Sequence, residues 1–198
     1  MTKVSNGRRP RIVVTGGPGA GKTTAIDIFR REIGEAIVVV PEAGTILFAG
    51  GFPRSHLPVA RCAAQLAIYQ TQCQIELAQA ALYPGRILLC DRGTLDGAAY
   101  WPDGQESYFQ AIGSSLENEL ARYDAVVFFE TAAAGGYDIE GNQIRVESPS
   151  DAVALDRRLQ ALWSQHRNYM LVPHQPSFIS KLMSGLDAIK NRVAALAG

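Results

Sequence analysis

Short apolar runs, rich in Val, Ile, Leu and Phe, alternate along the chain with longer segments in which apolar residues recur at helical spacing. The apolar runs predict five buried strands, at residues 12–15, 36–40, 87–90, 125–130 and 169–172. Strands that alternate with helices usually pair in parallel and are covered by helices on both faces. The pattern therefore predicts a three-layer α/β fold, with a five-stranded parallel sheet flanked by helices.

The segments between the strands predict helices at residues 23–33, 58–83, 106–123 and 178–196, and a further helix that opens at residue 148. The sequence Ser148-Pro149-Ser150-Asp151 marks that opening, because it is an S-x-x-D cap with proline at the first helical position. No internal repeat or low-complexity tract interrupts the pattern. We therefore expect a flexible N-terminal tail at residues 1–10 and a single domain at residues 11–198.

The segment between the first strand and the first helix reads GGPGAGKTT and fits the pattern GxxxxGK(S/T) in full. Its glycines let the backbone curl so that N–H groups point at an anion, and the helix N-terminus adds partial positive charge. Lys22 is expected to reach the β- and γ-phosphates, and the Thr23 hydroxyl to ligate Mg²⁺. A turn that binds nothing is the alternative, but lysine and threonine serve no turn geometry. The predicted nucleotide-binding residues are Gly16, Gly17, Pro18, Gly19, Ala20, Gly21, Lys22, Thr23 and Thr24.

Charged residues follow the second and third predicted strands, at the edge of the sheet where such folds bind ligands. Asp91 ends an apolar run, as in a Walker B motif, and is expected to hold Mg²⁺ opposite Thr23. Glu42 is expected to orient or deprotonate an acceptor hydroxyl, and Arg92 to bind phosphate or carboxylate. The alternatives are a turn cap at Asp91, a helix-initiating acid at Glu42 and a solvent-facing side chain at Arg92.

Residues 132–158, after the fourth strand, predict a lid. Flexible glycines precede several arginines in this segment, as a closing element requires if it excludes water and brings positive charge onto a transferring phosphoryl group. Arg145 is the candidate catalytic arginine, because it lies outside the regular helix. For Arg157 and Arg158, a solvated helix face is the alternative.

Several other residues receive no defined role from their pattern. Asp96 precedes glycine, which is common in turns, so whether Asp96 contacts a ligand stays open. The same question stays open for Arg54 and His174. Three aromatic residues could stack on an acceptor ring, with ordinary core packing as the alternative: Phe52, Tyr100 and Trp101.

Composition narrows the range of partners. Lys plus Arg and Asp plus Glu each count 19 in 198 residues, which gives no support to a nucleic-acid footprint or a polybasic membrane anchor. No apolar run is long enough to insert stably in a membrane, and the N-terminus has no apolar signal segment. The 3 cysteines have no metal-ligand spacing, so we expect reduced thiols and a cytoplasmic protein. The oligomeric state stays open.

Five segments together resemble one family of P-loop domains: GGPGAGKTT, VVVPEAG, LLCDRG, DAVVFFET and NQIRVESPSDAVALDRRLQALWSQH. They are similar to the P-loop domain of NadR and of TRP-channel trafficking proteins, which is labelled an AAA domain but is closer to nucleoside and nucleotide kinases. The resemblance covers residues 11 to about 189. Some relatives phosphorylate nicotinamide riboside, with a strand-three Asp on the metal and a lid arginine, and Asp91 and Arg145 match those positions. Others bind GTP and phosphoinositide.

Two functions are consistent with these observations. The leading hypothesis is a kinase that transfers the γ-phosphoryl group of Mg·ATP to a nucleoside-, nucleotide- or vitamin-like acceptor. Its expected catalytic residues are Lys22, Glu42, Asp91, Arg92 and Arg145, with Thr23 and Asp91 on the metal. The alternative is a nucleotide-dependent switch or scaffold that hydrolyses slowly and binds a protein or phosphoinositide partner. ATP is favoured over GTP, because the sequence has no Asn-Lys-x-Asp guanine-reading motif.

Overall fold

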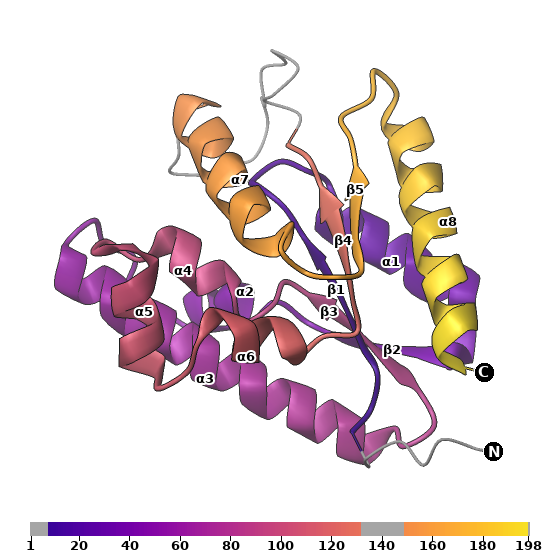
Figure 1. The fold of residues 1–198 in the computed structure, drawn as a ribbon, viewed down its shortest axis with the longest axis horizontal. Helices are drawn as coiled ribbons and strands as arrows, with labels where there is room; N and C mark the ends of the chain where they lie inside the picture. Colours follow the sequence, from indigo (N-terminus) through magenta and orange to yellow (C-terminus); the bar gives the residue numbers. More distant parts are fainter. Residues whose placement is uncertain (1–7, 132–148, 198) are drawn as a thin grey trace.

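The computed structural model describes residues 8–131 and 149–197 (Figure 1). Five parallel strands form one sheet in the order β2-β3-β1-β4-β5. The strands are β1 (Arg11–Thr15), β2 (Ile37–Val40), β3 (Ile87–Asp91), β4 (Ala125–Phe129) and β5 (Tyr169–Val172). The five predicted strands are thereby confirmed in position, and each predicted end lies within one residue of the observed one, although β5 at the edge of the sheet is only partly buried.

Helices cover both faces of the sheet, which confirms the three-layer arrangement (Figure 1). One face packs against α1 (Lys22–Ile33) and α8 (Phe178–Ala197). The opposite face packs against α3 (Pro58–Leu82), α4 (Asp96–Tyr100), α5 (Gly104–Ile112), α6 (Leu116–Ala121) and α7 (Pro149–Trp163). The short 3-10 helix η1 (Gly34–Ala36) precedes β2, and the short helix α2 (Ala43–Ala49) follows it.

Successive residues of β1 enter opposite core layers, because side chains alternate across a strand. Ile12 and Val14 pack into the core that α1 and α8 complete, whereas Val13 packs into the core around Trp163. All three β1 side chains are fully buried. This burial on both faces explains why the strands are continuous apolar runs rather than alternating ones.

The predicted helix at residues 106–123 is wrong, because two shorter helices, α5 and α6, occupy this part of the chain. Gly113 ends α5 with a φ of 63°, a left-handed conformation that glycine adopts without strain. Ser115 then caps α6, since its hydroxyl accepts a hydrogen bond from the Asn118 N–H at 3.2 Å. The predicted single helix therefore contains both a stop signal and a start signal.

The remaining helices agree with the sequence, apart from two omissions. The short helices α2 and α4 were not predicted, because segments of 7 and 5 residues show little periodicity. The predicted cap residue Ser148 and most of the predicted lid, residues 132–148, lie outside the described residues. Arg8, which the sequence assigns to the tail, forms an ion pair with Asp124 just before β4. None of the helices within residues 8–131 and 149–197 is long and apolar enough to cross a membrane.

Candidate active site

A cleft of about 840 Å³ lies beside the predicted phosphate loop, at the carboxyl ends of β1, β2 and β3. Its walls come from the loop before α1, from α2, from the middle of α3, from the turn after β3, and from α4 and α5. Most of the predicted nucleotide-binding residues line it, namely Pro18, Gly19, Gly21, Lys22, Thr23 and Thr24, whereas Gly16, Gly17 and Ala20 do not. The structure therefore places the phosphate loop at the edge of the sheet that the sequence predicted.

The phosphate loop owes its shape to glycine. Gly16, Gly19 and Gly21 have φ angles of 137°, 77° and 82°, in the region that L side chains rarely adopt. A Cβ on Gly16 would lie 2.0 Å from the carbonyl oxygen of Phe129, at the end of β4. The close approach of the loop to β4 therefore requires glycine at this position.

Lys22, the first residue of α1, is buried with its ammonium group against the loop backbone. Nζ donates hydrogen bonds to the carbonyl oxygens of Gly16 and Gly17, at 2.9 and 2.8 Å. Burial and the neighbouring charge of Arg92 lower the pKa of Lys22 to about 7. An anionic phosphate next to this ammonium group would favour its charged form.

Thr23 and Asp91 lie together, as the metal-site prediction requires. The Thr23 hydroxyl donates to Oδ2 of Asp91 at 3.2 Å, and Oδ1 of Asp91 is buried without a hydrogen-bond partner among the described residues. Burial and the charge of Glu42 raise the pKa of Asp91 to about 6. The described residues contain no cluster of three or more His, Cys, Asp or Glu side chains suited to a metal ion. A hydroxyl and an unpartnered carboxylate oxygen fit Mg²⁺, which takes few protein ligands and completes its shell with phosphate and water oxygens.

Arg92 forms ion pairs with Glu42, at the end of β2, and with Asp96, after β3. Its Nε lies 2.7 Å from Oε1 of Glu42, and its Nη1 donates to Oδ2 of Asp96 at 3.0 Å. Its backbone has a φ of 69°, the one positive φ of a non-glycine residue in the described part of the chain. Backbone strain of this kind is concentrated at functional sites. The prediction that Arg92 lies at the site agrees with this geometry, and the solvent-facing alternative does not.

Glu42 lies directly before α2, but its side chain does not cap that helix. Oε2 instead accepts a hydrogen bond from the Thr45 hydroxyl at 2.8 Å, while Oε1 pairs with Arg92. Burial favours the protonated form of Glu42, but Arg92 and Thr45 outweigh it and hold the pKa of Glu42 below its usual value. The cleft therefore contains an ionised carboxylate opposite the phosphate loop.

Asp96 is buried and links the cleft to the core. Its carboxylate accepts hydrogen bonds from the Thr15 hydroxyl at 2.9 Å and from Nε1 of Trp163 at 2.6 Å, and it pairs with Arg92. Three donors from three parts of the chain thus converge on one carboxylate. This geometry makes Asp96 the residue that holds Arg92 in place, which the sequence left undecided.

The end of the cleft remote from the phosphate loop has aromatic and amide walls. The guanidinium group of Arg54 lies 4.2 Å from the ring centroid of Phe48. Gln65 and Gln72, two helical turns apart on α3, line the same cleft together with Tyr100, and Nε2 of Gln72 lies 3.4 Å from the Arg92 carbonyl oxygen. Phe48, Gln65 and Gln72 were not predicted as site residues, although the spacing of the two glutamines on one helix face was visible in the sequence.

The other open residues lie away from this region or outside the described part. Trp101 is buried, and its Nε1 donates to the Ser107 hydroxyl at 3.2 Å, so it packs in the core. The His174 N–H donates to Oε2 of Glu130 at 2.8 Å, beyond the end of β4. Arg157 and Arg158 are exposed on α7. Arg145 lies outside the described residues, so its role stays a prediction.

A known protein family and a solved structure match the chain over most of its length. A family model described as "AAA domain" matches residues 11–177. The chain belongs to the AAA domain family. A solved structure of deoxyadenosine kinase from M. mycoides with bound dATP matches with a TM-score of 0.61 and 15% identity, over 94% of this chain and 100% of the kinase chain. This likeness shows that the AAA domain has the fold of P-loop nucleoside kinases. No sequence among curated proteins matches the chain significantly.

One loop contact of this AAA domain was not predicted. Asp156, on α7, accepts a hydrogen bond from the Gly17 N–H at 2.6 Å. On α7 the sequence had drawn attention only to the neighbouring Arg157 and Arg158, and whether they contact a ligand was left open. The apolar pattern of α7 contained a signal for Asp156, because this residue follows Leu155 and lies, like Leu155, on the face of the helix that packs inward.

Proposed function

We propose that this AAA domain is a kinase that transfers the γ-phosphoryl group of Mg·ATP to a hydroxyl group of a small-molecule acceptor. The observation that carries the proposal is the continuity of the cleft, because the phosphate loop and the Glu42–Arg92 ion pair line the same cavity. Phosphoryl transfer depends mainly on positioning the two reactants and on stabilising charge in one site. A cavity with a phosphate loop at one end and an ionised carboxylate opposite it meets both needs.

On the donor side, the N–H groups of the loop and the ammonium group of Lys22 bind the phosphates. Thr23 and Asp91 would hold Mg²⁺, which supplies positive charge to the β- and γ-phosphate oxygens when it is bound. The low pKa of Lys22 rises as phosphate oxygens approach, so its positive charge is stabilised where negative charge develops. GTP is the alternative donor.

On the acceptor side, Glu42 takes the proton of the acceptor hydroxyl as its oxygen forms a bond to the γ-phosphorus. The bond from the γ-phosphorus to the β–γ bridging oxygen breaks, and ADP leaves. Arg92 keeps Glu42 ionised and oriented through their 2.7 Å ion pair. Arg145 supplies further positive charge to the phosphoryl group in this proposal, as in the NadR-type domains that the chain resembles.

The walls remote from the loop suit a planar acceptor that carries polar atoms. Phe48 and Tyr100 offer ring faces or edges, and Gln65 offers an amide donor and acceptor, whereas the Gln72 amide N–H₂ already donates to Glu76 and to the Arg92 carbonyl oxygen. These groups are compatible with a nucleoside-, nucleotide- or vitamin-like molecule. The dATP that the solved deoxyadenosine kinase binds belongs to the same chemical class.

Thermal unfolding with pairs of ligands tests this proposal. A ligand that binds the folded chain raises its apparent stability by mass action. We expect a non-hydrolysable Mg·ATP analogue to raise the Tm, and an acceptor from a panel of hydroxyl-bearing nucleosides, nucleotides and vitamins to raise it further. Glu42→Gln should leave the nucleotide effect in place. If the nucleotide-loaded protein gains no stability from any acceptor and transfers phosphate to none, the kinase proposal is wrong.

A further inference from the structure

Three buried side chains outside the cleft bind the backbone of the phosphate loop, and we call them the outer clamp: Thr131, Asp156 and Lys181. The Thr131 hydroxyl donates to the Pro18 carbonyl oxygen at 2.6 Å. Asp156 accepts from the Gly17 N–H at 2.6 Å, and Lys181 donates to the Ala20 carbonyl oxygen at 3.0 Å. Three alternate peptide groups of the loop, 16–17, 18–19 and 20–21, are thus each bound from outside the cleft.

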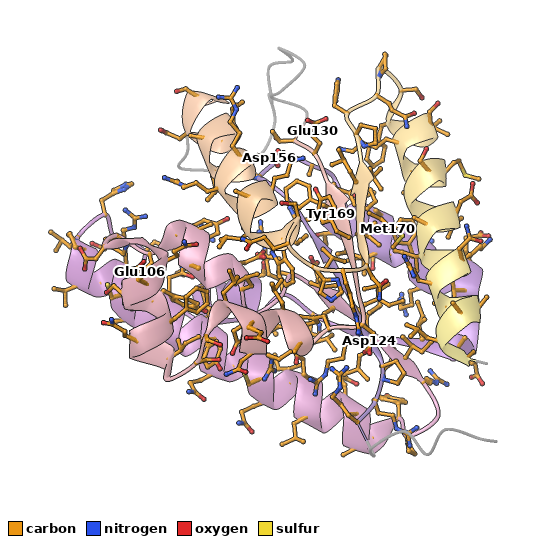
Figure 2. The ribbon with its side chains drawn as sticks, viewed as in Figure 1. Glu106, Asp124, Glu130, Asp156, Tyr169 and Met170 are labelled. Carbon is orange, nitrogen blue, oxygen red and sulfur yellow. The ribbon has the colours of Figure 1, made fainter. Side chains whose placement is uncertain are left out.

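The outer clamp is itself connected to the end of β4. Oδ1 of Asp156 also accepts from the Thr131 N–H at 3.2 Å, and Nζ of Lys181 donates to the Glu130 carbonyl oxygen at 2.5 Å. Figure 2 shows Glu130 and Asp156 at the same end of the sheet, on β4's extension and on α7. A buried lysine and a buried aspartate cost free energy unless they are hydrogen-bonded, so these contacts are specific features of the fold.

The contacts determine which way the peptide groups of the loop face. In a trans peptide the carbonyl of one residue and the N–H of the next point in opposite directions. Because Thr131 binds the Pro18 carbonyl from outside, the N–H of Gly19 faces inward. Lys181 acts in the same way on the Ala20 carbonyl, so the N–H of Gly21 also faces inward.

Asp156 accepts a hydrogen bond from the loop, whereas Thr131 and Lys181 donate to it, so its contact tests the same reasoning in the opposite direction. Asp156 binds the Gly17 N–H from outside, so the Gly16 carbonyl should face the cleft. It does, because Nζ of Lys22 lies 2.9 Å from the Gly16 carbonyl oxygen. Among the described residues, the N–H groups of Gly19 and Gly21 donate no hydrogen bond, and both residues line the cleft.

We propose that Thr131, Asp156 and Lys181 are positioning residues that orient the peptide planes of the phosphate loop, so that the N–H groups of Gly19 and Gly21 bind the phosphates of the nucleotide. The inference rests on the proposed function only in that the loop binds a nucleotide. It does not depend on which acceptor, if any, receives the phosphoryl group.

The test measures Mg·ADP binding by calorimetry and the amide signals of the loop by NMR, using the ¹⁵N-labelled chain. Thr131→Val removes the hydroxyl with little change in shape, and Thr131→Ser is the matched control that keeps it. We expect the Kd for Mg·ADP to rise about tenfold in Thr131→Val, the size expected for one hydrogen bond near a charged ligand, and about twofold or less in Thr131→Ser. Lys181→Met should raise the Kd by a similar factor.

The NMR readout separates positioning from a general loss of structure. In the wild type, Mg·ADP should shift the amide signals of both Gly19 and Gly21. Thr131→Val should reduce mainly the Gly19 shift, and Lys181→Met mainly the Gly21 shift. Where Thr131→Val does not fold, the Gly21 shift in Lys181→Met decides in the same way.

Three outcomes would overturn the inference. Folded variants that bind Mg·ADP as tightly as the wild type, with unchanged Gly19 and Gly21 shifts, would contradict the positioning role of the outer clamp but not the proposed function. Equal losses in Thr131→Val and Thr131→Ser do the same, because the hydroxyl would then be irrelevant. A wild-type chain that binds no Mg·ADP contradicts both the outer clamp and the proposed function.

Discussion

Nε of Arg92 lies 2.7 Å from Oε1 of Glu42, in the cleft that the phosphate loop lines. The same guanidinium group, whose side chain is 17% exposed, also binds the buried Asp96, so one partly buried cation is held by two carboxylates. Removing a single member of such a group leaves a charge unpaired, which costs more than the pair itself contributes. The arrangement therefore fixes an ionised acid at the carboxyl end of β2, in the cleft that the predicted phosphate loop also lines.

Glu42→Gln tests the role of that acid. The amide keeps the shape of the side chain but cannot take a proton, so we expect kcat to fall by about 10²–10⁴-fold, the range for loss of a general base. The Kd for Mg·ATP should change little, because Glu42 lies on the acceptor side. Glu35→Gln is the matched control, since the Glu35 side chain is 92% exposed. Equal kcat values for Glu42→Gln and the wild type would rule out general-base catalysis by Glu42.

Asp96→Ala should destabilise the fold. It leaves the Thr15 hydroxyl, the Trp163 indole N–H and the Arg92 guanidinium without their shared acceptor. Loss of one partner of a buried ion pair costs about 3–5 kcal/mol in the free energy of unfolding. Urea unfolding measures this loss, with Asp187→Ala on the exposed face of α8 as the control, expected within about 0.5 kcal/mol of wild type. A loss at Asp96 no larger than at Asp187 would show that the network is not structurally important.

Asp91→Asn addresses the metal site. The amide cannot supply the anionic oxygen that the buried Oδ1 offers, so the Mg²⁺ concentration for half-maximal nucleotide binding should rise at least about tenfold. Mg²⁺ titration of fluorescent ATP binding measures this. Asp27→Asn makes the same charge change on the exposed side of α1 and should leave the titration unchanged. Overlapping titrations for Asp91→Asn and wild type would exclude Asp91 from metal binding.

The buried Lys181 leads to a prediction of how folding stability depends on pH. Burial lowers the pKa of Lys181 to about 8, against the opposing charges of Asp156 and Glu130, from an ordinary value of 10.5. Between pH 8 and 10.5 the unfolded chain binds more protons at this site than the folded chain, so folding stability rises with pH in that window. Lys181→Met lacks this contribution. The stability of wild type relative to Lys181→Met should therefore increase as urea unfolding is repeated from pH 7 to pH 10, and parallel pH profiles would contradict the assignment.

The sequence predicts the parts of the site that depend on local patterns. Each strand is a continuous apolar run, as expected where both faces of the sheet are buried, which holds for β1, β3 and β4. The loop motif lies between the first strand and its helix. Glu42, Asp91 and Arg92 were found because each lies within two residues of the end of such a run. The carboxyl ends of parallel strands meet at one edge of the sheet, so the parallel topology implied that these three residues lie close together.

The rest of the site depends on contacts that local patterns do not contain. Asp156 and Lys181 lie 139 and 161 residues from their partners in the phosphate loop, and no spacing rule connects them. Asp96 looked like a turn residue because glycine follows it, whereas burial and three converging donors decide its role. The helices α5 and α6 were merged because apolar spacing outweighed the Gly113 and Ser115 signals in the prediction.

The fate of the γ-phosphoryl group tests the central claim most directly. The 198-residue chain would be incubated with Mg²⁺, ATP labelled at the γ-phosphorus, and a fractionated pool of small metabolites, with products identified by mass spectrometry. The kinase account predicts that the label enters an organic phosphate ester, at a rate that Glu42→Gln lowers by about 10²–10⁴-fold. Recovery of the label only as inorganic phosphate or as unchanged ATP would contradict it, and inorganic phosphate would favour a slowly hydrolysing switch instead.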